Sequence, residues 1–281
     1  MTDTTERPRS RRPADPDASR MTLVEHLTEL RSRLVKSVIA LSIATIAAFV
    51  FFEPILAFLQ RPFCDLPANL RFPPDGGDCQ LYVTGILDQF VIRMRVAIMT
   101  GAVVSAPVWL WQLWQFVTPG LHQRERRWAV PFVASSIVLF AAGGVFAYYT
   151  LDNGLQFLLG VGGEGITSIL TVDKYLGFVS LMLLAFGVSF EFPLLMLFLN
   201  IVGVTPTAKL RRWRRGMYFG LCVFAAVITP SQDPMTFLLM WVPLVLSYEF
   251  VILFGRIRDR MRRGRDTEST DQWSDDEVSP L

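Results

Sequence analysis

Three glutamates lie where a carboxylate could do chemistry. Glu29 follows a basic N-terminal segment, Glu125 lies between arginines in residues 124–127, and Glu191 lies inside a long apolar run. A carboxylate can accept two parallel hydrogen bonds from a guanidinium, so Glu29 and Glu125 could each bind an arginine of a partner if they share a membrane face. The alternative for each is a solvated charge or a local ion pair, which contributes little when exposed.

Glu191 is the strongest single candidate for a functional residue, because placing an ionisable group near the centre of a bilayer costs on the order of several kcal/mol of free energy. Its carboxyl group must therefore face protein, water or a polar partner, and either a functional role or internal hydrogen bonding would meet that requirement. Pro193 follows two residues later and is expected to kink the helix and free a carbonyl. Glu249 lies toward the inner end of a later apolar run, where its side chain could reach the interface.

Catalytic chemistry fits the sequence poorly. His-Glu-x-x-His and phosphate-loop motifs are missing, and both histidines, His26 and His122, lie outside the apolar runs. A serine–histidine pair within the bilayer is therefore excluded, and no aspartate lies in the middle of a run to form an aspartyl-protease pair. We predict no catalytic residue, no metal site and no cofactor.

The elements that position these side chains are apolar helices. The chain has 281 residues, of which 52% are hydrophobic and only 19% charged. About 20 apolar residues in a helix cross a bilayer core of about 30 Å. Six runs approach this length, at residues 34–59, 90–113, 128–151, 175–204, 216–229 and 235–254. The predicted fold class is an all-α membrane protein with six transmembrane helices.

The fifth run is short, since residues 216–229 would cover only about 21 Å at 1.5 Å per residue. A short helix must thin the bilayer locally, unless the boundary is misplaced by a few residues. Before the first run, residues 22–33 predict an amphipathic helix at the inner surface. Thr22 and Glu25 there form a capping box at its start.

Basic residues set the predicted orientation. Of the 27 lysines and arginines, 22 lie in residues 7–36, 124–127, 209–215 and 256–265, all on one side of the six runs. This asymmetry places both termini in the cytoplasm. The net charge of +2 does not indicate nucleic acid as a partner. We expect a disordered basic tail over residues 1–21, a six-helix domain over 22–258 and a disordered cytoplasmic tail over 259–281.

Two of the three cysteines, Cys64 and Cys79, fall in the first outer loop, at about residues 60–88. The compartment on that side is oxidising, so a disulfide between them is compatible with their position, although the sequence alone leaves it open. Cys222 lies in the fifth run, where a small packing residue is expected.

Taken together, several segments resemble one known family. The matching segments are His26–Leu34, Ser105–Phe116, Pro119 with Glu125–Arg127, Phe186–Pro193, and the Thr229-Pro230 turn with Asp233. In this order and topology the chain resembles TatC, the receptor subunit of the twin-arginine protein translocase, over about residues 22–258. One departure is the third outer loop, which reads Thr-Pro-Ser-Gln-Asp-Pro where TatC proteins more often have Thr-Pro-Pro-Asp.

The resemblance implies a set of roles in a bacterial inner membrane. The residues expected to bind the twin-arginine signal peptide of a folded cargo are Glu29, Arg31, Phe116 and Glu125. Glu191 corresponds to an intramembrane acid on the concave face of a glove-shaped bundle. Further candidates for partner contact or structure are Pro62, Gln112, Asp233 and Glu249.

Partners follow from the same resemblance. Single-span TatA- and TatB-type subunits are expected to dock at the short fifth and sixth spans, with energy from the proton-motive force. The lipid bilayer and other copies of the chain are further expected partners. A small-solute secondary transporter is the main alternative. It typically has a midplane site, broken helices and an internal repeat, and the sequence shows no convincing repeat.

Overall fold

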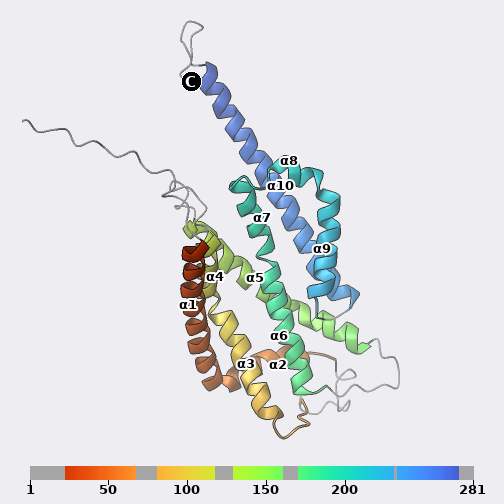
Figure 1. The fold of residues 1–281 in the computed structure, drawn as a ribbon. Helices are drawn as coiled ribbons and strands as arrows, with labels where there is room; N and C mark the ends of the chain where they lie inside the picture. Colours follow the sequence, from red (N-terminus) through yellow and green to blue (C-terminus); the bar gives the residue numbers. More distant parts are fainter. Residues whose placement is uncertain (1–22, 68–80, 118–128, 161–169, 231–232, 272–281) are drawn as a thin grey trace, which may run out of the picture.

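The computed structural model describes residues 23–67, 81–117, 129–160, 170–230 and 233–271, with the side chains of the last segment described as far as Met261. These residues form ten α-helices that make up one elongated bundle (Figure 1). In chain order the helices are α1 (Leu23–Val50), α2 (Phe52–Cys64), α3 (Asp88–Val104), α4 (Ala106–Val117), α5 (Ala129–Gly160), α6 (Val172–Ser189), α7 (Phe192–Ile201), α8 (Thr207–Arg212), α9 (Arg214–Ile228) and α10 (Pro234–Asp271).

Several of these helices are long and apolar enough to cross a membrane. Four such segments are Val24–Val50, Val130–Gly160, Val172–Ile201 and Pro234–Met261. The pair α3 and α4 makes a fifth if the two are taken as one span with a bend of 54°. The prediction of an all-helical membrane protein is therefore confirmed. The fifth predicted span, residues 216–229, corresponds to α9, whose 15 residues cover about 22 Å.

The first predicted span, residues 34–59, is wrong in its boundaries. One helix, α1, runs from Leu23 through the predicted surface helix and into the apolar run, and it ends at Val50. After Phe51 the chain turns into α2, which lies across the lower end of the bundle (Figure 1). Pro54 explains the turn, because a proline ring clashes with the carbonyl four residues earlier, here that of Val50. The predicted capping residue Thr22 lies outside the described residues.

Two further predicted spans are interrupted in the same way. The run 90–113 is split at Ser105, shortly before Pro107, and the run 175–204 is split at Phe190 and Glu191, shortly before Pro193. Each preceding helix ends three or four residues before the proline, where the missing N–H and the ring clash disfavour a continuous helix. The kink expected from Pro193 stays a prediction, since Val172–Ile201 forms one candidate span with a short interruption at Phe190 and Glu191.

The C-terminal prediction needs a correction. Residues 259–281 were expected to be a disordered tail, but α10 continues without a break to Asp271. Arginine and methionine are good helix formers, and adding residues to an existing helix avoids the unfavourable nucleation step. Residues 272–281 lie outside the described part of the chain.

Close contacts between backbones hold the central helices together. A Cβ added to Gly143 on α5 would meet the carbonyl oxygen of Phe186 at 2.7 Å, and one added to Gly101 on α3 would meet the backbone nitrogen of Thr45 on α1 at 2.8 Å. Small residues let membrane helices approach in this way, where dispersion contacts replace the hydrophobic effect. The core lies around α6, whose Leu176, Val179 and other inward side chains are fully buried.

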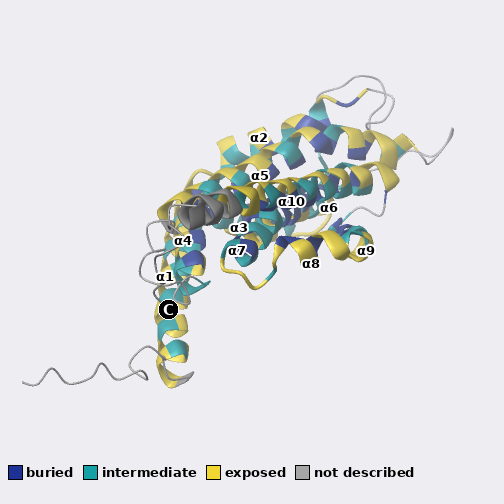
Figure 2. Ribbon diagram, turned by 90° about the horizontal axis from the view of Figure 1, so that it is seen from above, coloured by how far each residue is buried: buried dark blue, intermediate teal, exposed yellow. Residues whose placement is uncertain are grey.

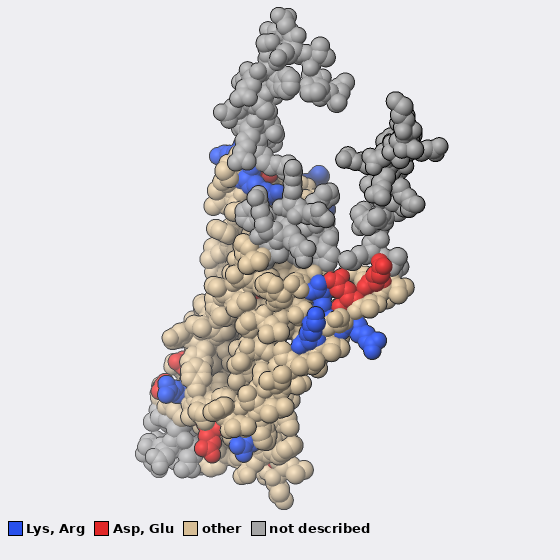
Figure 3. Space-filling view, turned by 90° about the vertical axis from the view of Figure 1, so that its left-hand side faces the viewer, with Lys and Arg blue, Asp and Glu red and all other residues tan. Residues whose placement is uncertain are grey.

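Much of the apolar surface faces outward. Exposed and half-buried residues cover the outer sides of the helices, and buried ones lie between them (Figure 2). Charged side chains gather in a few clusters, and most of the visible surface between the clusters carries no charge (Figure 3). Large exposed apolar surfaces of this kind are unusual for a soluble protein and suit contact with lipid.

Candidate functional site

A polar cluster lies where α4 packs against the first turns of α1. Arg33 donates from its Nε to Glu29 Oε1 over 3.0 Å and also from its Nη2 to the same oxygen. Its Nη1 donates to Gln115 Oε1 on α4 over 2.5 Å. Beside them, the His26 ring stacks on Phe116 with centroids 4.4 Å apart and 19° between planes. The structure thus brings Glu29 and Phe116, two of the predicted site residues, to one helix junction.

Only one of the two carboxylate oxygens of Glu29 has a hydrogen-bond partner among the described residues. Its side chain is 23% exposed, and its Oε2 atom is shielded from solvent with no hydrogen-bond partner within the described part of the chain. Arg31 is exposed, and a two-residue spacing turns it to the side of α1 away from Glu29. Glu125 lies outside the described residues. Sequence reasoning missed Arg33 and Gln115, although the spacing of Glu29 and Arg33 at i and i+4 was a signal for that pair.

A second polar cluster lies inside the bundle and also includes a residue of α4, Trp114. Trp114 Nε1 donates to Ser136 Oγ on α5 over 2.9 Å, and Ser136 Oγ donates to Glu191 Oε2 over 2.6 Å. Trp114 and Ser136 are buried, and the indole packs against Phe132 and Phe198 at centroid distances of 5.7 and 5.4 Å. This chain of hydrogen bonds joins α4, α5 and the break between α6 and α7.

Glu191 is thus held inside the protein, as a buried polar group requires. Its other oxygen, Oε1, is shielded from solvent and lacks a hydrogen-bond partner among the residues that the structure describes. Internal hydrogen bonding therefore accounts for one carboxyl oxygen and leaves the second available. The backbone at the break is satisfied locally, since Glu191 N donates to Val188 O over 3.1 Å and Glu191 O accepts from Leu195 N over 3.0 Å.

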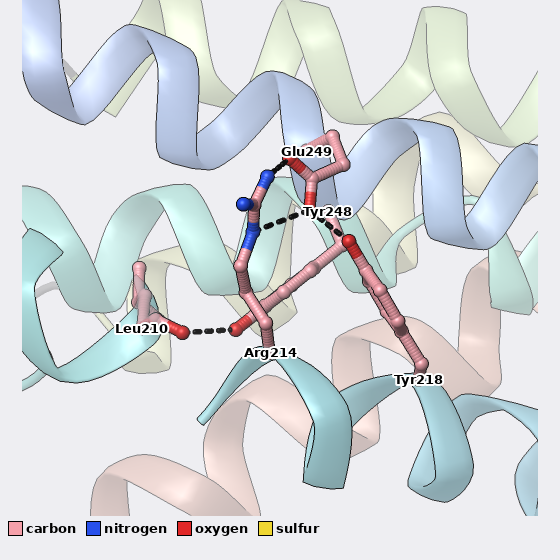
Figure 4. Close-up of polar contacts among 5 residues, drawn as sticks. All are labelled: Leu210, Arg214, Tyr218, Tyr248 and Glu249. Atoms are coloured by element: carbon pink, nitrogen blue, oxygen red, sulfur yellow. Dashed lines mark hydrogen bonds and ion pairs between the residues drawn. The ribbon is translucent and has the colours of Figure 1, made fainter. Parts of the chain in front are cut away.

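Glu249 has internal partners and does not stand alone at the interface. Arg214 Nε donates to Glu249 Oε1 over 2.9 Å, and its Nη2 donates to Oε2, so the pair is bidentate. The hydroxyl of Tyr218 also donates to Oε1. Beside them, Tyr248 donates to the carbonyl of Leu210 over 2.8 Å (Figure 4). These contacts connect α10 with α8 and α9.

The other predicted positions lie within helices or at a helix end. Asp233 is buried and caps α10, since its Oδ1 accepts the backbone N–H of Thr236 over 2.7 Å. Pro62 is buried within α2, and Gln112 is half-buried on α4 with its Oε1 shielded from solvent. Cys64 is disulfide-bonded, but Cys79 lies outside the described residues, so their pairing stays a prediction.

The described segments contain no candidate metal site, since no group of three or more histidine, cysteine, aspartate or glutamate side chains there could hold an ion. The arrangement can instead bind a cation through Glu29 and hold a carboxyl group inside the bundle through Ser136.

Comparison with known proteins decides the family. Residues 25–243 match the family model described as Sec-independent protein translocase protein (TatC). The chain belongs to the TatC family. It is 52% identical over 276 residues to the Sec-independent protein translocase protein TatC of Frankia casuarinae, covering 96% of this chain and 76% of that relative. The TatC protein of Deinococcus radiodurans is 33% identical, covering 88% of this chain and 90% of that relative.

Solved structures agree with this assignment. A crystal structure of the twin-arginine translocase receptor TatC in DDM superposes with a TM-score of 0.68 at 35% identity, covering 82% of this chain and 99% of that one. This TatC-family chain is accordingly a membrane component of the Sec-independent, twin-arginine protein translocase, a transport protein.

Proposed function

We propose that this chain is the signal-peptide receptor of the translocase, and that Glu29 and Glu125 each bind one arginine of a twin-arginine signal peptide. The observation that carries the proposal is the cluster at the junction of α1 and α4. It contains a carboxylate with one oxygen paired to Arg33 and the other shielded and without a partner in the described residues.

The chemistry of this cluster suits a guanidinium. Arg33 already demonstrates the fit, because its Nε and Nη2 both donate to Glu29. An incoming arginine would use the remaining oxygen or take the place of Arg33, which keeps Gln115 as a second acceptor. The stacked rings of His26 and Phe116 offer a flat surface on which a guanidinium plane can lie.

The second arginine requires a second carboxylate. Glu125 follows the end of α4 closely in the sequence, and α4 supplies both Gln115 and Phe116 to the cluster. In this proposal both carboxylates lie on the cytoplasmic side, with both termini, because 22 of the 27 basic side chains are on that side. The short helix α9 is then the fifth of six spans, and its edge with α10, the sixth, is where TatA- and TatB-type single-span subunits dock.

Glu191 has a separate role in the proposal, as a polar point inside the bundle behind the entry site. The support is its position at the α6–α7 break and its link through Ser136 to Trp114, which is next to Gln115 on α4. Energy for transport comes from the proton-motive force and cargo arrives folded. The protein lies in the bacterial inner membrane.

Peptide binding by purified protein tests the receptor proposal. We expect Glu29→Gln to weaken binding of an Arg-Arg signal peptide by about 10- to 100-fold, because a charge-assisted hydrogen-bond pair contributes about 1.5–3 kcal/mol. A Lys-Lys peptide should bind the unchanged protein weakly, since an ammonium cannot make the planar bidentate contact. Glu125→Gln should act in the same direction.

The matched control is Glu53→Gln, which removes an exposed carboxylate on α2 at the other end of α1. It should bind the peptide as the unchanged protein does. All variants must first elute as monodisperse, helical protein. Equal binding by Glu29→Gln, Glu125→Gln and the unchanged protein would reject the receptor proposal.

A further inference from the structure

A basic cavity lies between α8 and α10, away from the clusters described above. Its volume is about 450 Å³, and α8 lies directly beside α10 (Figure 1). The lining side chains are Thr207, Ala208 and Arg211 of α8 and Arg256, Asp259 and Arg260 of α10. Three guanidinium groups against one carboxylate give the cavity a net positive charge.

None of these three arginines makes a close polar contact in the part of the bundle that the structure describes, although Arg256 lies within electrostatic range of Glu249. No ion pair or hydrogen bond among the described side chains involves Arg211, Arg256 or Arg260, and Arg256 Nε is shielded from solvent without a partner there. The neighbouring Arg258 differs from these three, because its guanidinium donates to the carbonyls of Asn200 and Ile201 at the end of α7. A shielded N–H without an acceptor is costly, so the Nε of half-buried Arg256 lacks an acceptor that an anion in the cavity could supply, beside the exposed guanidinium groups of Arg211 and Arg260.

The walls of the cavity are firmly positioned. Gly255 lets α10 approach α8 closely, since a Cβ there would lie 2.6 Å from Thr207 Oγ1. The hydrogen bond of 2.8 Å from Tyr248 to the carbonyl of Leu210 ties the same two helices together. Arg256 and Arg260 are spaced at i and i+4, which places both on one face of α10. A site held by rigid helices needs little reorganisation on binding.

The level of the cavity along α10 indicates the source of the anion. Arg256 and Arg260 lie in the last turns of the apolar segment Pro234–Met261. Exposed apolar side chains flank them on the same helix, namely Leu253, Phe254, Ile257 and Met261. Such an alternation of exposed apolar and basic residues is found where hydrocarbon gives way to phosphate headgroups.

We propose that this cavity binds the phosphate group of an anionic glycerophospholipid. The arginines of α8 and α10 donate to the phosphate oxygens, and the acyl chains lie along the exposed apolar side chains of α10. Basic pockets between membrane helices are known to suit such headgroups, and each arginine near an anionic surface contributes about fivefold in affinity. This site is independent of the proposed peptide receptor.

Native mass spectrometry of the delipidated protein provides the test. The probes are phosphatidylglycerol, phosphatidylcholine and inorganic phosphate, each titrated separately. We expect one retained phosphatidylglycerol molecule, weaker phosphatidylcholine binding, and no competition from inorganic phosphate at equal concentration. Arg256→Gln with Arg260→Gln should weaken phosphatidylglycerol binding by about 25-fold, at about fivefold per arginine.

Matched variants keep the result interpretable. Arg212→Gln with Arg215→Gln removes the same charge from exposed positions that do not line the cavity, and should change binding by less than about twofold. Ala208→Trp fills the cavity without altering charge and should also weaken binding. Unchanged affinity in both cavity variants would overturn the proposal, as would equal losses in the control pair. Full competition by inorganic phosphate would overturn the assignment to a lipid.

Discussion

Ser136→Ala is the most direct test of the buried chain between α4 and α7. The substitution removes only a hydroxyl, but that hydroxyl accepts from Trp114 Nε1 over 2.9 Å and donates to Glu191 Oε2 over 2.6 Å. Both bonds are lost together. A hydrogen bond within a membrane bundle contributes about 0.6 kcal/mol on average and up to about 1.7 kcal/mol. Two of them give an expected loss of about 1–3 kcal/mol in the free energy of unfolding.

The upper half of that range is the better expectation. Trp114 is buried, so its N–H finds no water when the hydroxyl is gone, and an unsatisfied buried donor costs more than the bond it made. The measurement is reversible unfolding of purified protein in mixed micelles with a rising fraction of denaturing detergent, followed by far-ultraviolet circular dichroism. Trp114→Phe should show non-additivity with Ser136→Ala, because both remove the same bond.

Ser189→Ala is the matched control for Ser136→Ala. Both serines are 0% exposed, but Ser189 Oγ has no hydrogen-bond partner among the described residues. Losing its hydroxyl should change the free energy of unfolding by less than about 0.5 kcal/mol. If the two alanine variants were destabilised equally, the cost would come from packing alone, and the hydrogen-bonded chain would have no measurable role.

Three further predictions concern other helix contacts. A double-mutant cycle of Glu249→Gln and Arg214→Gln should give a coupling of about 1 kcal/mol in the same unfolding assay, a modest value because both side chains are about one-third exposed; additive effects would contradict it. Gly101→Ala should lower the free energy of unfolding by about 1–3 kcal/mol, because the added Cβ has no room against α1. Its control is Gly220→Ala, whose Cβ would meet no atom within 4 Å and which should be neutral or stabilising by up to about 1 kcal/mol. Asp233→Ala should cost about 1 kcal/mol through loss of the α10 cap, and an unchanged midpoint of unfolding would argue against that cap.

The helices themselves could largely be predicted from apolar runs, but their breaks could not. Helices end three or four residues before Pro54, Pro107 and Pro193, which a local rule would find. The same rule fails at Pro62 and Pro243, which lie inside continuous helices. Packing decides which prolines interrupt a helix, because neighbouring elements can satisfy the freed backbone groups in one place and not in another.

The contacts of the candidate site that could not be predicted are those between residues far apart in the sequence. The i, i+4 spacing of Glu29 and Arg33 was available, but the contact of Arg33 with Gln115 spans 82 positions and depends on α1 packing on α4. The same holds for Arg214, the partner of Glu249 from a different helix. The positions of Glu29 and Glu249 along their helices could be read from the sequence, and only the packed bundle assigns their partners.

Three consecutive residues of α4 hold the two clusters in a fixed relation. Gln115 accepts from Arg33, Phe116 stacks on His26, and Trp114 donates toward Glu191 through Ser136. Successive residues of a helix point about 100° apart, so one short helix can contact α1 on one side and α5 on the other. Because the helix is rigid over such a length, displacing Arg33 from Gln115 and shifting α4 relative to α1 would also strain the bond between Trp114 and Ser136. The proposed receptor cluster and the carboxyl group of Glu191 are therefore connected through adjacent residues of one helix, with no intervening loop.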